Sequence, residues 1–192
     1  MSNEPNISPT YKVIVAGDGN VGKTSLIRRY CEGKFDLTRQ ATRLVERGDP
    51  GVDFQTKAVQ VGDLSIKLSI WDIAGQDRFV SFRDTFYTGA HAVGLVYDVT
   101  SPATFFNLMH WRDEIQSIVP LVPMVVIGNK IDIYNVIPPE EARGWAKSLN
   151  MPFLLTSAAT GEHVNEFFAG LAFLAVKEQQ RRDERERAEK SG

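Results

Sequence analysis

A lysine and a threonine follow two glycines at fixed offsets in the segment Gly17–Thr24 (GDGNVGKT). This spacing is typical of a phosphate-binding loop, because glycines let the backbone close around phosphate oxygens and present its N–H groups to them. We expect Lys23 to reach the β- and γ-phosphates of a nucleotide and to act in catalysis. The Thr24 hydroxyl is a hard oxygen donor suited to Mg²⁺. The nucleotide-binding residues predicted here are Gly19, Asn20, Val21, Gly22, Lys23, Thr24 and Ser25. A glycine-rich turn without a ligand is the alternative interpretation.

A second set of reactive residue types lies in Leu68–Gln76 (LSIWDIAGQ). Asp72 follows a predicted strand, so its carboxylate is expected to hold Mg²⁺ through a water molecule, although a plain strand-end cap is the alternative. The N–H of Gly75 can meet the γ-phosphate because no side chain intervenes. Gln76 can orient the attacking water for phosphoryl transfer, and we predict that it is catalytic.

Asp132, in the segment Asn129–Asp132 (NKID), can distinguish guanine from adenine. Its carboxylate can accept two hydrogen bonds, from N1 and N2 of guanine, whereas adenine offers no such pair of donors. Leaving a buried carboxylate unpaired costs roughly 1–3 kcal/mol, which gives selectivity. Asn129 is expected to tie this loop to the phosphate loop, and the stem of Lys130 to lie along the base.

Two further segments are candidates for contacts to the base. Ser157, Ala158 and Ala159 follow a predicted strand, and a backbone N–H near Ala158 could meet the guanine carbonyl. Phe35, at the end of the first predicted helix, could cover the edge of the base. A plain strand-to-helix loop and a core phenylalanine are the alternative interpretations.

The elements that must hold these residues alternate between strands and helices. Strands are predicted at 11–16, 92–99, 123–128 and 152–156, where apolar residues are continuous, and a hairpin at 52–61 and 64–71, where polar and apolar residues alternate. Helices are predicted at 24–32, 101–119, from 138 onward and at 163–176. This order predicts an α/β fold of the P-loop type, with a mostly parallel six-stranded sheet, one antiparallel edge strand and helices on both faces.

Length and composition limit the class of protein. The 192 residues suit one domain with a core, and the net charge of -2 provides no basic field for nucleic acid. Cys31 is the only cysteine, so no disulfide can form within the chain. We find no signal peptide and no apolar stretch of about 18 residues, and therefore expect a cytoplasmic protein. The predicted organisation is a flexible N-terminus at 1–10, a nucleotide-binding domain at 11–176 and a charged helical or disordered tail at 177–192.

The combined motifs resemble the Ras superfamily of small GTPases, and most closely its Rab branch. The resemblance rests on GDGNVGKTSLIRRY, WDIAGQ and GNKID, with FYTGAHAVGLVYDVT and GVDF as Rab-like segments. It covers about residues 11–176 and implies a Ras-like G domain. It also implies a switch that binds GTP or GDP with Mg²⁺, hydrolyses GTP slowly and recruits an effector protein in the GTP state. GTPase-activating and exchange proteins are implied partners, and we expect a monomer.

The sequence departs from the family pattern at four places. Extra residues around Arg43–Asp49 lengthen the segment in which a family threonine closes over Mg²⁺, so Thr42 or Asp49 takes that place, and we predict Thr42. Asn20 replaces a usual glycine, and Ala159 replaces a usual lysine. No cysteine stands near the C-terminus, so no prenyl anchor is encoded in this sequence. Either the protein works in solution, or another protein brings it to membranes, or a tail was trimmed.

The residues of the site leave two hypotheses for function. The intact Lys23, Thr24, Asp72 and Gln76 favour a GTP hydrolase. The open choice between Thr42 and Asp49 at the place of the family threonine favours the alternative, a nucleotide-locked scaffold that binds GTP or GDP with little turnover. Slow hydrolysis is expected in either case, because no arginine stands in an evident position to stabilise the transition state from within the chain.

Three aromatic residues suggest a surface for an effector protein. Phe54, Trp71 and Phe86 come from segments predicted to lie near the switch regions. Finding all three side chains buried would remove this hypothesis.

Overall fold

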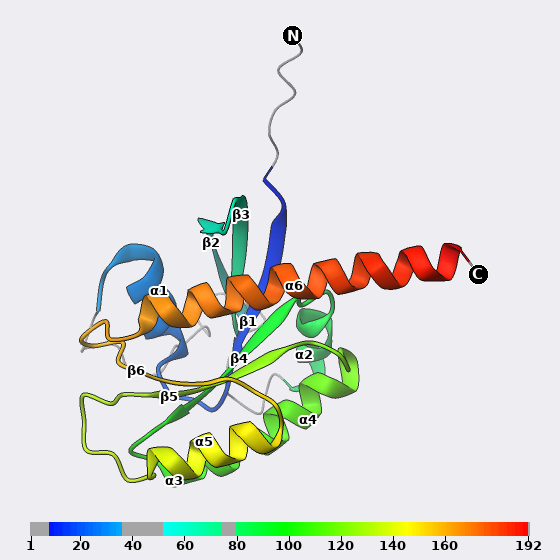
Figure 1. Ribbon diagram of the computed structural model, residues 1–192. Helices are drawn as coiled ribbons and strands as arrows, with labels where there is room; N and C mark the ends of the chain where they lie inside the picture. The colour runs from blue at the N-terminus through cyan, green and yellow to red at the C-terminus, as the bar shows by residue number, and fades with distance from the viewer. Residues whose placement is uncertain (1–7, 36–51, 74–79, 192) are drawn as a thin grey trace.

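A six-stranded sheet runs through the centre of the part of the protein that the structure describes (Figure 1). This computed structural model describes residues 8–35, 52–73 and 80–191. The strand order is β2-β3-β1-β4-β5-β6, and only the β2–β3 pair is antiparallel within this sheet. The strands are β1 (Thr10–Ala16), β2 (Val52–Val61), β3 (Leu64–Ile73), β4 (Ala92–Asp98), β5 (Met124–Asn129) and β6 (Phe153–Thr156). The predicted fold class is confirmed.

Helices cover both faces of the sheet (Figure 1). The helices α1 (Lys23–Glu32) and α6 (Val164–Lys190) pack on one face. The opposite face is covered by α3 (Pro102–Phe106), α4 (Leu108–Ile118) and α5 (Pro139–Ser148), with α2 (Val80–Tyr87) beside α4. Because strands buried on both faces need apolar residues at every position, β1, β4 and β5 are the continuous apolar runs of the sequence.

The strand β1 shows how one segment serves both cores. Val13 and Val15 lie in the core beneath α1 and α6, whereas Ile14 and Ala16 lie in the core on the other face. This division follows from the alternation of side chains along a strand. All four side chains are fully buried, so β1 fixes the position of the loop that follows it.

The β2–β3 hairpin has the register that its turn dictates. Gly62 and Asp63 form the turn, Val61 pairs with Leu64, and Gly62 has a φ of 57°, in the left-handed region that glycine adopts readily. The pairing continues to the far end of the hairpin and places Asp53 opposite Asp72.

Some elements differ from the prediction. The helix expected at 101–119 is divided at Asn107 into α3 and α4. The strand β3 continues to Ile73, past its predicted end at Trp71. The helix α2 was not predicted, because the mixed polar and aromatic sequence VSFRDTFY follows neither a helical nor a strand period clearly.

The last helix, α6, continues far beyond its predicted end at Val176, through the charged tail to Lys190. Polar contacts hold its middle against the sheet. Glu178 is buried and forms ion pairs with Arg182 at 3.1 Å and Arg185 at 2.9 Å. Arg182 also donates a hydrogen bond to the carbonyl of Ala90 at 2.5 Å, before β4. The tail expected to be helical or disordered is therefore helical through Lys190, and its last turns extend past the sheet (Figure 1).

Near the same place, His91 joins three segments. Its Nδ1 accepts a hydrogen bond from the backbone N–H of Lys12 at 3.1 Å, and its Nε2 lies 3.0 Å from Oε1 of Gln179 on α6. Burial lowers the pKa of His91, and the nearby Arg182 lowers it further.

In the described segments, no helix is both long and apolar enough to cross a lipid bilayer.

Candidate functional site

The turn between β1 and α1 has the backbone that a phosphate-binding loop requires. Gly17 has a φ of 139°, and a Cβ there would overlap the carbonyl oxygen of Val96. Gly22 has a φ of 95°, and a Cβ there would overlap the side-chain amide of Asn129. Asn20 also lies in the left-handed region, with a φ of 66°. Asparagine adopts this region more readily than most residues, which accounts for its replacing the usual glycine.

Lys23 lies across this loop. It is the first residue of α1, only 6% of its surface is exposed, and its Nζ donates hydrogen bonds to the carbonyls of Gly17 at 2.8 Å and Asp18 at 2.6 Å. The loop therefore surrounds an ammonium group, which can favour a phosphate held by the same turn. Ser25 follows in the first turn of α1, whereas Gly19 lies at the outer bend, where an added Cβ would meet no atom within 4 Å.

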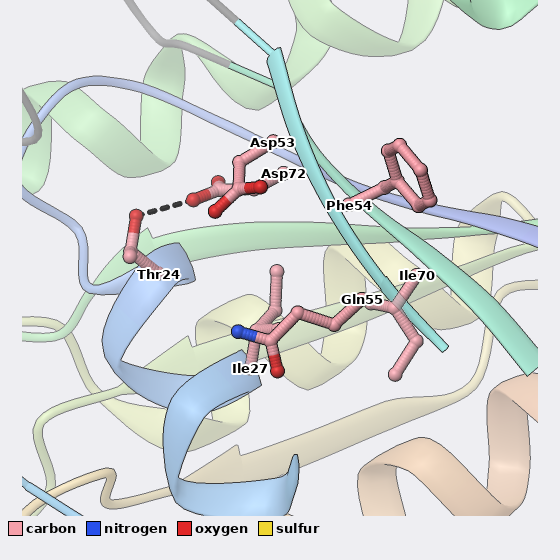
Figure 2. Close-up of a pocket in the computed structure, with 7 residues that line it drawn as sticks. All are labelled: Thr24, Ile27, Asp53, Phe54, Gln55, Ile70 and Asp72. Atoms are coloured by element: carbon pink, nitrogen blue, oxygen red, sulfur yellow. Dashed lines mark hydrogen bonds between the residues drawn. The ribbon is translucent and has the colours of Figure 1, made fainter. Parts of the chain in front are cut away.

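Two oxygen donors meet where α1 begins and β3 ends (Figure 2). The Thr24 hydroxyl donates a hydrogen bond to Oδ2 of Asp72, and the Asp72 side chain is buried. A hydroxyl and a carboxylate in contact are hard oxygen ligands of the kind that Mg²⁺ accepts alongside water and phosphate oxygens. The donor set therefore fits the predicted metal ion.

A second carboxylate lies beside this pair and was not identified from the sequence. Asp53 on β2 is opposite Asp72 in the hairpin, and both line a small pocket with Thr24, as Figure 2 shows. The position of Asp53 could have been deduced by counting back from the turn at Gly62, since a hairpin register is fixed by its turn.

Asp18 is a second residue that sequence reasoning missed. Its Oδ2 accepts a hydrogen bond from Nδ2 of Asn107 at 2.7 Å, and its Oδ1 accepts one from Nε1 of Trp111 at 2.8 Å. These bonds attach the phosphate loop to the junction between α3 and α4, far along the chain. They also give a reason for the helix break at Asn107, whose side chain points to the loop.

Asn129 connects the base-reading segment to the phosphate loop. It ends β5, is almost fully buried, and its Nδ2 donates to the carbonyl of Val21 at 2.9 Å. Its Oδ1 accepts hydrogen bonds from the Thr156 hydroxyl at 3.2 Å and the Ala158 N–H at 3.3 Å. One amide thus joins the ends of two strands and the phosphate loop.

Asp132 and Lys130 are held by partners on neighbouring segments. The Ser157 hydroxyl donates to Oδ1 of Asp132 at 2.5 Å. The Nζ of Lys130 forms an ion pair with Oδ2 of Asp98 at 2.5 Å, which fixes the end of its stem. Asp132 is exposed, so its carboxylate would be buried only beneath a bound base.

The last predicted base contacts lie around the end of α1. Phe35 is half-buried and packs against the core beneath α1 and α6, which agrees in part with the alternative interpretation of this residue. Ala158 and Ala159 expose their carbonyls to Arg29, whose Nε donates to Ala158 at 2.8 Å and whose Nη2 donates to Ala159. Arg29 was not identified from the sequence.

Several predicted site residues lie outside the described residues. They are Thr42 and Asp49, the inserted segment 43–49, Gly75 and Gln76.

The three predicted surface aromatics form one cluster, in which Phe54 stacks on Trp71 and the Phe86 ring is tilted against it. The rings of Phe54 and Trp71 are 5.4 Å apart, and those of Trp71 and Phe86 are 6.0 Å apart. Phe54 is 59% exposed and the other two are half-buried, so the condition that would have removed the effector-surface hypothesis is not met. The Nζ of Lys12 lies 4.1 Å from the centre of the Trp71 ring, and burial lowers the pKa of Lys12.

The loop between β1 and α1, the oxygen donors at the end of β3 and the polar ends of β5 and β6 lie at one edge of the sheet. Together they define a nucleotide-binding protein of the P-loop class.

Comparison with known proteins gives the family. The model of the Ras family matches residues 12–177. "Ras-related protein Rab7" of Pisum sativum is 44% identical over 176 residues, which are 86% of this chain and 82% of that protein. "Ras-related protein Rab7" of Drosophila melanogaster is 43% identical over 86% of this chain and 80% of its own length. "Ras-related protein RABG3f" of Arabidopsis thaliana is 42% identical over 86% of this chain and 82% of its own length. The chain belongs to the Ras family and is a Rab-like, GTP-hydrolysing small GTPase.

Proposed function

We propose that this GTPase binds GTP and GDP together with Mg²⁺, hydrolyses GTP slowly, and recruits an effector protein while GTP is bound. The observation that carries the proposal is the contact between the Thr24 hydroxyl and the Asp72 carboxylate beside the ammonium of Lys23. A hydroxyl, a carboxylate and an ammonium at one helix start are the groups that a magnesium–nucleotide phosphate complex needs.

Each group has a separate role in the phosphate site. Thr24 and Thr42 would hold Mg²⁺ directly, and Asp72 would hold it through water. The ion would neutralise negative charge on the nucleotide phosphates. Lys23 would exchange its bonds to loop carbonyls for bonds to phosphate oxygens. The N–H of Gly75 would contact the γ-phosphate, and Gln76 would orient the attacking water.

The base would be read by the ends of β5 and β6. Asp132 would accept the N1 and N2 hydrogen bonds of guanine, and its Oδ1 would also keep the hydrogen bond from the Ser157 hydroxyl. The stem of Lys130, held by its ion pair with Asp98, would lie along one side of the base. Phe35 would cover the edge of the base.

The cluster of Phe54, Trp71 and Phe86 is the surface we propose for the effector. It includes the edge strand β2, which immediately follows the proposed first switch segment. Partly exposed aromatic side chains in contact with one another are typical anchors of protein interfaces. A GTPase-activating protein would accelerate hydrolysis and an exchange protein would release GDP. We further propose a monomer in the cytoplasm, recruited to membranes by a partner, with a G domain at 11–176 followed by the charged helical tail.

Single-turnover hydrolysis tests the proposal. Purified protein loaded with GTP is supplied with Mg²⁺, and phosphate release is compared with that of Gln76→Leu. The control is Gln180→Leu, an exposed glutamine on α6. We expect slow release that falls in Gln76→Leu and is unchanged in Gln180→Leu. Tight binding of GTP without release from any of the three proteins would instead indicate a nucleotide-held scaffold, and the segment 43–49 would be the first region to replace.

A further inference from the structure

Arg29 connects the helix that follows the phosphate loop with the loop proposed to read the base. Its Nε donates to the carbonyl of Ala158 at 2.8 Å, and its Nη2 donates to the carbonyl of Ala159. A third hydrogen bond, from Nη1 to the carbonyl of Gly33 at 3.3 Å, holds the guanidinium at the end of its own helix. The planar fork of an arginine can donate to adjacent carbonyls in this way, whereas a lysine ammonium has no such fixed geometry.

These bonds determine where the loop directs its N–H groups. The carbonyl of Ala158 and the N–H of Ala159 belong to one peptide unit, and no described peptide bond is cis. In a trans peptide the carbonyl and the N–H point in opposite directions. Because Arg29 holds the carbonyl of Ala158, the N–H of Ala159 points away from Arg29. The N–H of Ala158 is already directed to Oδ1 of Asn129.

The carbonyl of Ala159 connects Arg29 to Asp132, the carboxylate proposed to read the base. The carbonyl of Ala159 shares its peptide unit with the N–H of Thr160, which donates to the Ser157 hydroxyl oxygen at 3.0 Å. The Ser157 hydroxyl in turn donates to Oδ1 of Asp132 at 2.5 Å. Arg29 is therefore linked to Asp132 through one peptide unit and one hydroxyl group.

Ala158 and Ala159 supply no polar side chain of their own at this point of the loop. They carry only methyl groups, and Ala159 stands where a lysine would be usual. Gly161 has a φ of 89°, and a Cβ there would lie 3.8 Å from Cδ of Arg29, in ordinary contact. The ring of Phe35 is 5.8 Å from the guanidinium carbon. The Arg29 side chain thus lies between the backbone of the loop and Phe35, the residue proposed to cover the base.

We propose that Arg29 is a positioning residue for guanine recognition, which directs the Ala159 N–H at the guanine carbonyl and steadies Asp132 through Ser157. The proposal rests on the proposed function, because it requires that guanine binds between Asp132 and this loop. It assigns the carbonyl contact to the N–H of Ala159 and its support to a residue outside the loop.

The test compares three nucleotides and three variants. Dissociation constants and release rates are measured for GDP, for inosine diphosphate, which keeps the carbonyl, and for 2-aminopurine riboside diphosphate, which lacks it. The variants are Arg29→Ala, Arg29→Lys and the control Arg28→Ala, whose side chain forms a surface ion pair with Glu32 at 3.4 Å. Thermal unfolding of each GDP-bound variant, followed by circular dichroism, shows whether it is folded.

In Arg29→Ala we expect GDP and inosine diphosphate to bind about threefold to tenfold more weakly, which corresponds to one hydrogen bond. The 2-aminopurine nucleotide should lose less affinity, because it has no carbonyl and keeps only its 2-amino group as a donor to Asp132. Arg29→Lys should give a smaller loss with the same selectivity, and it carries the test if Arg29→Ala fails to fold. Arg28→Ala should bind all three nucleotides unchanged.

Equal weakening of all three nucleotides would overturn the proposal, because Arg29 would then only support the fold. Unchanged binding of GDP in folded Arg29→Ala would also overturn it. ADP is measured as well, with the unaltered protein alone. If ADP binds as tightly as GDP, the proposed guanine specificity is rejected, and the role of Arg29 with it. If the unaltered protein prefers GDP to ADP but Arg29→Ala weakens the binding of all three nucleotides equally, only the role of Arg29 is rejected.

Discussion

Replacing Asn129 with alanine should destabilise the protein and loosen the nucleotide site together. Asn129 is 1% exposed, and its side-chain amide makes hydrogen bonds to three groups, one in the phosphate loop and two at the end of β6. Alanine removes the donor to the carbonyl of Val21 and the acceptor for Thr156 and Ala158. The methyl group cannot replace either, so three polar groups lose their partner in a buried place.

The geometry of these bonds sets the size of the effect. The bond to Val21 is 2.9 Å long and buried, and an orphaned buried carbonyl costs about 1–3 kcal/mol. The bonds from Thr156 and Ala158 are longer, at 3.2 and 3.3 Å, and each should contribute about 0.5–1 kcal/mol. Together they give a loss of roughly 2–5 kcal/mol, a large part of the total stability of a domain of this size.

Urea unfolding of the GDP-bound protein, followed by circular dichroism, measures this loss, and the release of a fluorescent GDP measures the loosened site. The control is Asn165→Ala, which changes an exposed asparagine on α6 and should alter stability by less than about 0.5 kcal/mol. A loss below about 1 kcal/mol in Asn129→Ala, with release of GDP unchanged, would refute the reasoning, because the amide would then not hold the three segments together.

Three further predictions concern other contacts. Asp18→Ala should accelerate GDP release about threefold to tenfold, since the loop loses its bonds from α3 and α4; an unchanged rate in stopped-flow measurements would contradict this. Arg182→Ala should increase amide hydrogen exchange in the tail of α6, because it leaves the buried Glu178 with one ion pair fewer. Equal exchange in both proteins would show that the contacts of Arg182 with Glu178 and Ala90 are unimportant. For His91, burial lowers the pKa in the folded protein, so the unfolded chain binds the proton first as the pH falls. Its contribution to stability is complete above the ordinary pKa of 6.5 and is lost as the pH falls below that value towards the folded pKa, with a slope of at most about 1.4 kcal/mol per pH unit. His91→Gln should flatten the stability profile in that range, and identical profiles would exclude this contribution.

The sheet could be predicted well because its cause is local. Strands such as β4 and β5 are buried on both faces, and their continuous runs of apolar residues indicate this burial in the sequence itself. The end of β3 was placed too early because Asp72 is polar and was interpreted as the end of the strand. In the structure its carboxylate meets the Thr24 hydroxyl, so a polar residue remains within a buried strand.

The parts of the site that escaped prediction depend on contacts between distant segments. Asn107 and Trp111 bind Asp18 in the phosphate loop, and Arg29 binds the carbonyls of Ala158 and Ala159. No local period in the sequence shows which arginine on a helix will face a loop more than a hundred residues away. The motif residues were identifiable because phosphate, metal and base chemistry fixes their types and their spacing.

The long helix α6 has a mechanical consequence. Its 27 residues span about 40 Å at 1.5 Å per residue, and it begins shortly after the loop that contains Ala158 and Ala159. A helix of this length transmits force and rotation along its axis rather than absorbing them as a flexible linker does. A force applied near Lys190 would therefore turn the whole helix about the point where Arg182 anchors it to Glu178 and to the carbonyl of Ala90. Whatever is attached to that end would keep a defined orientation towards the nucleotide-binding edge of the sheet.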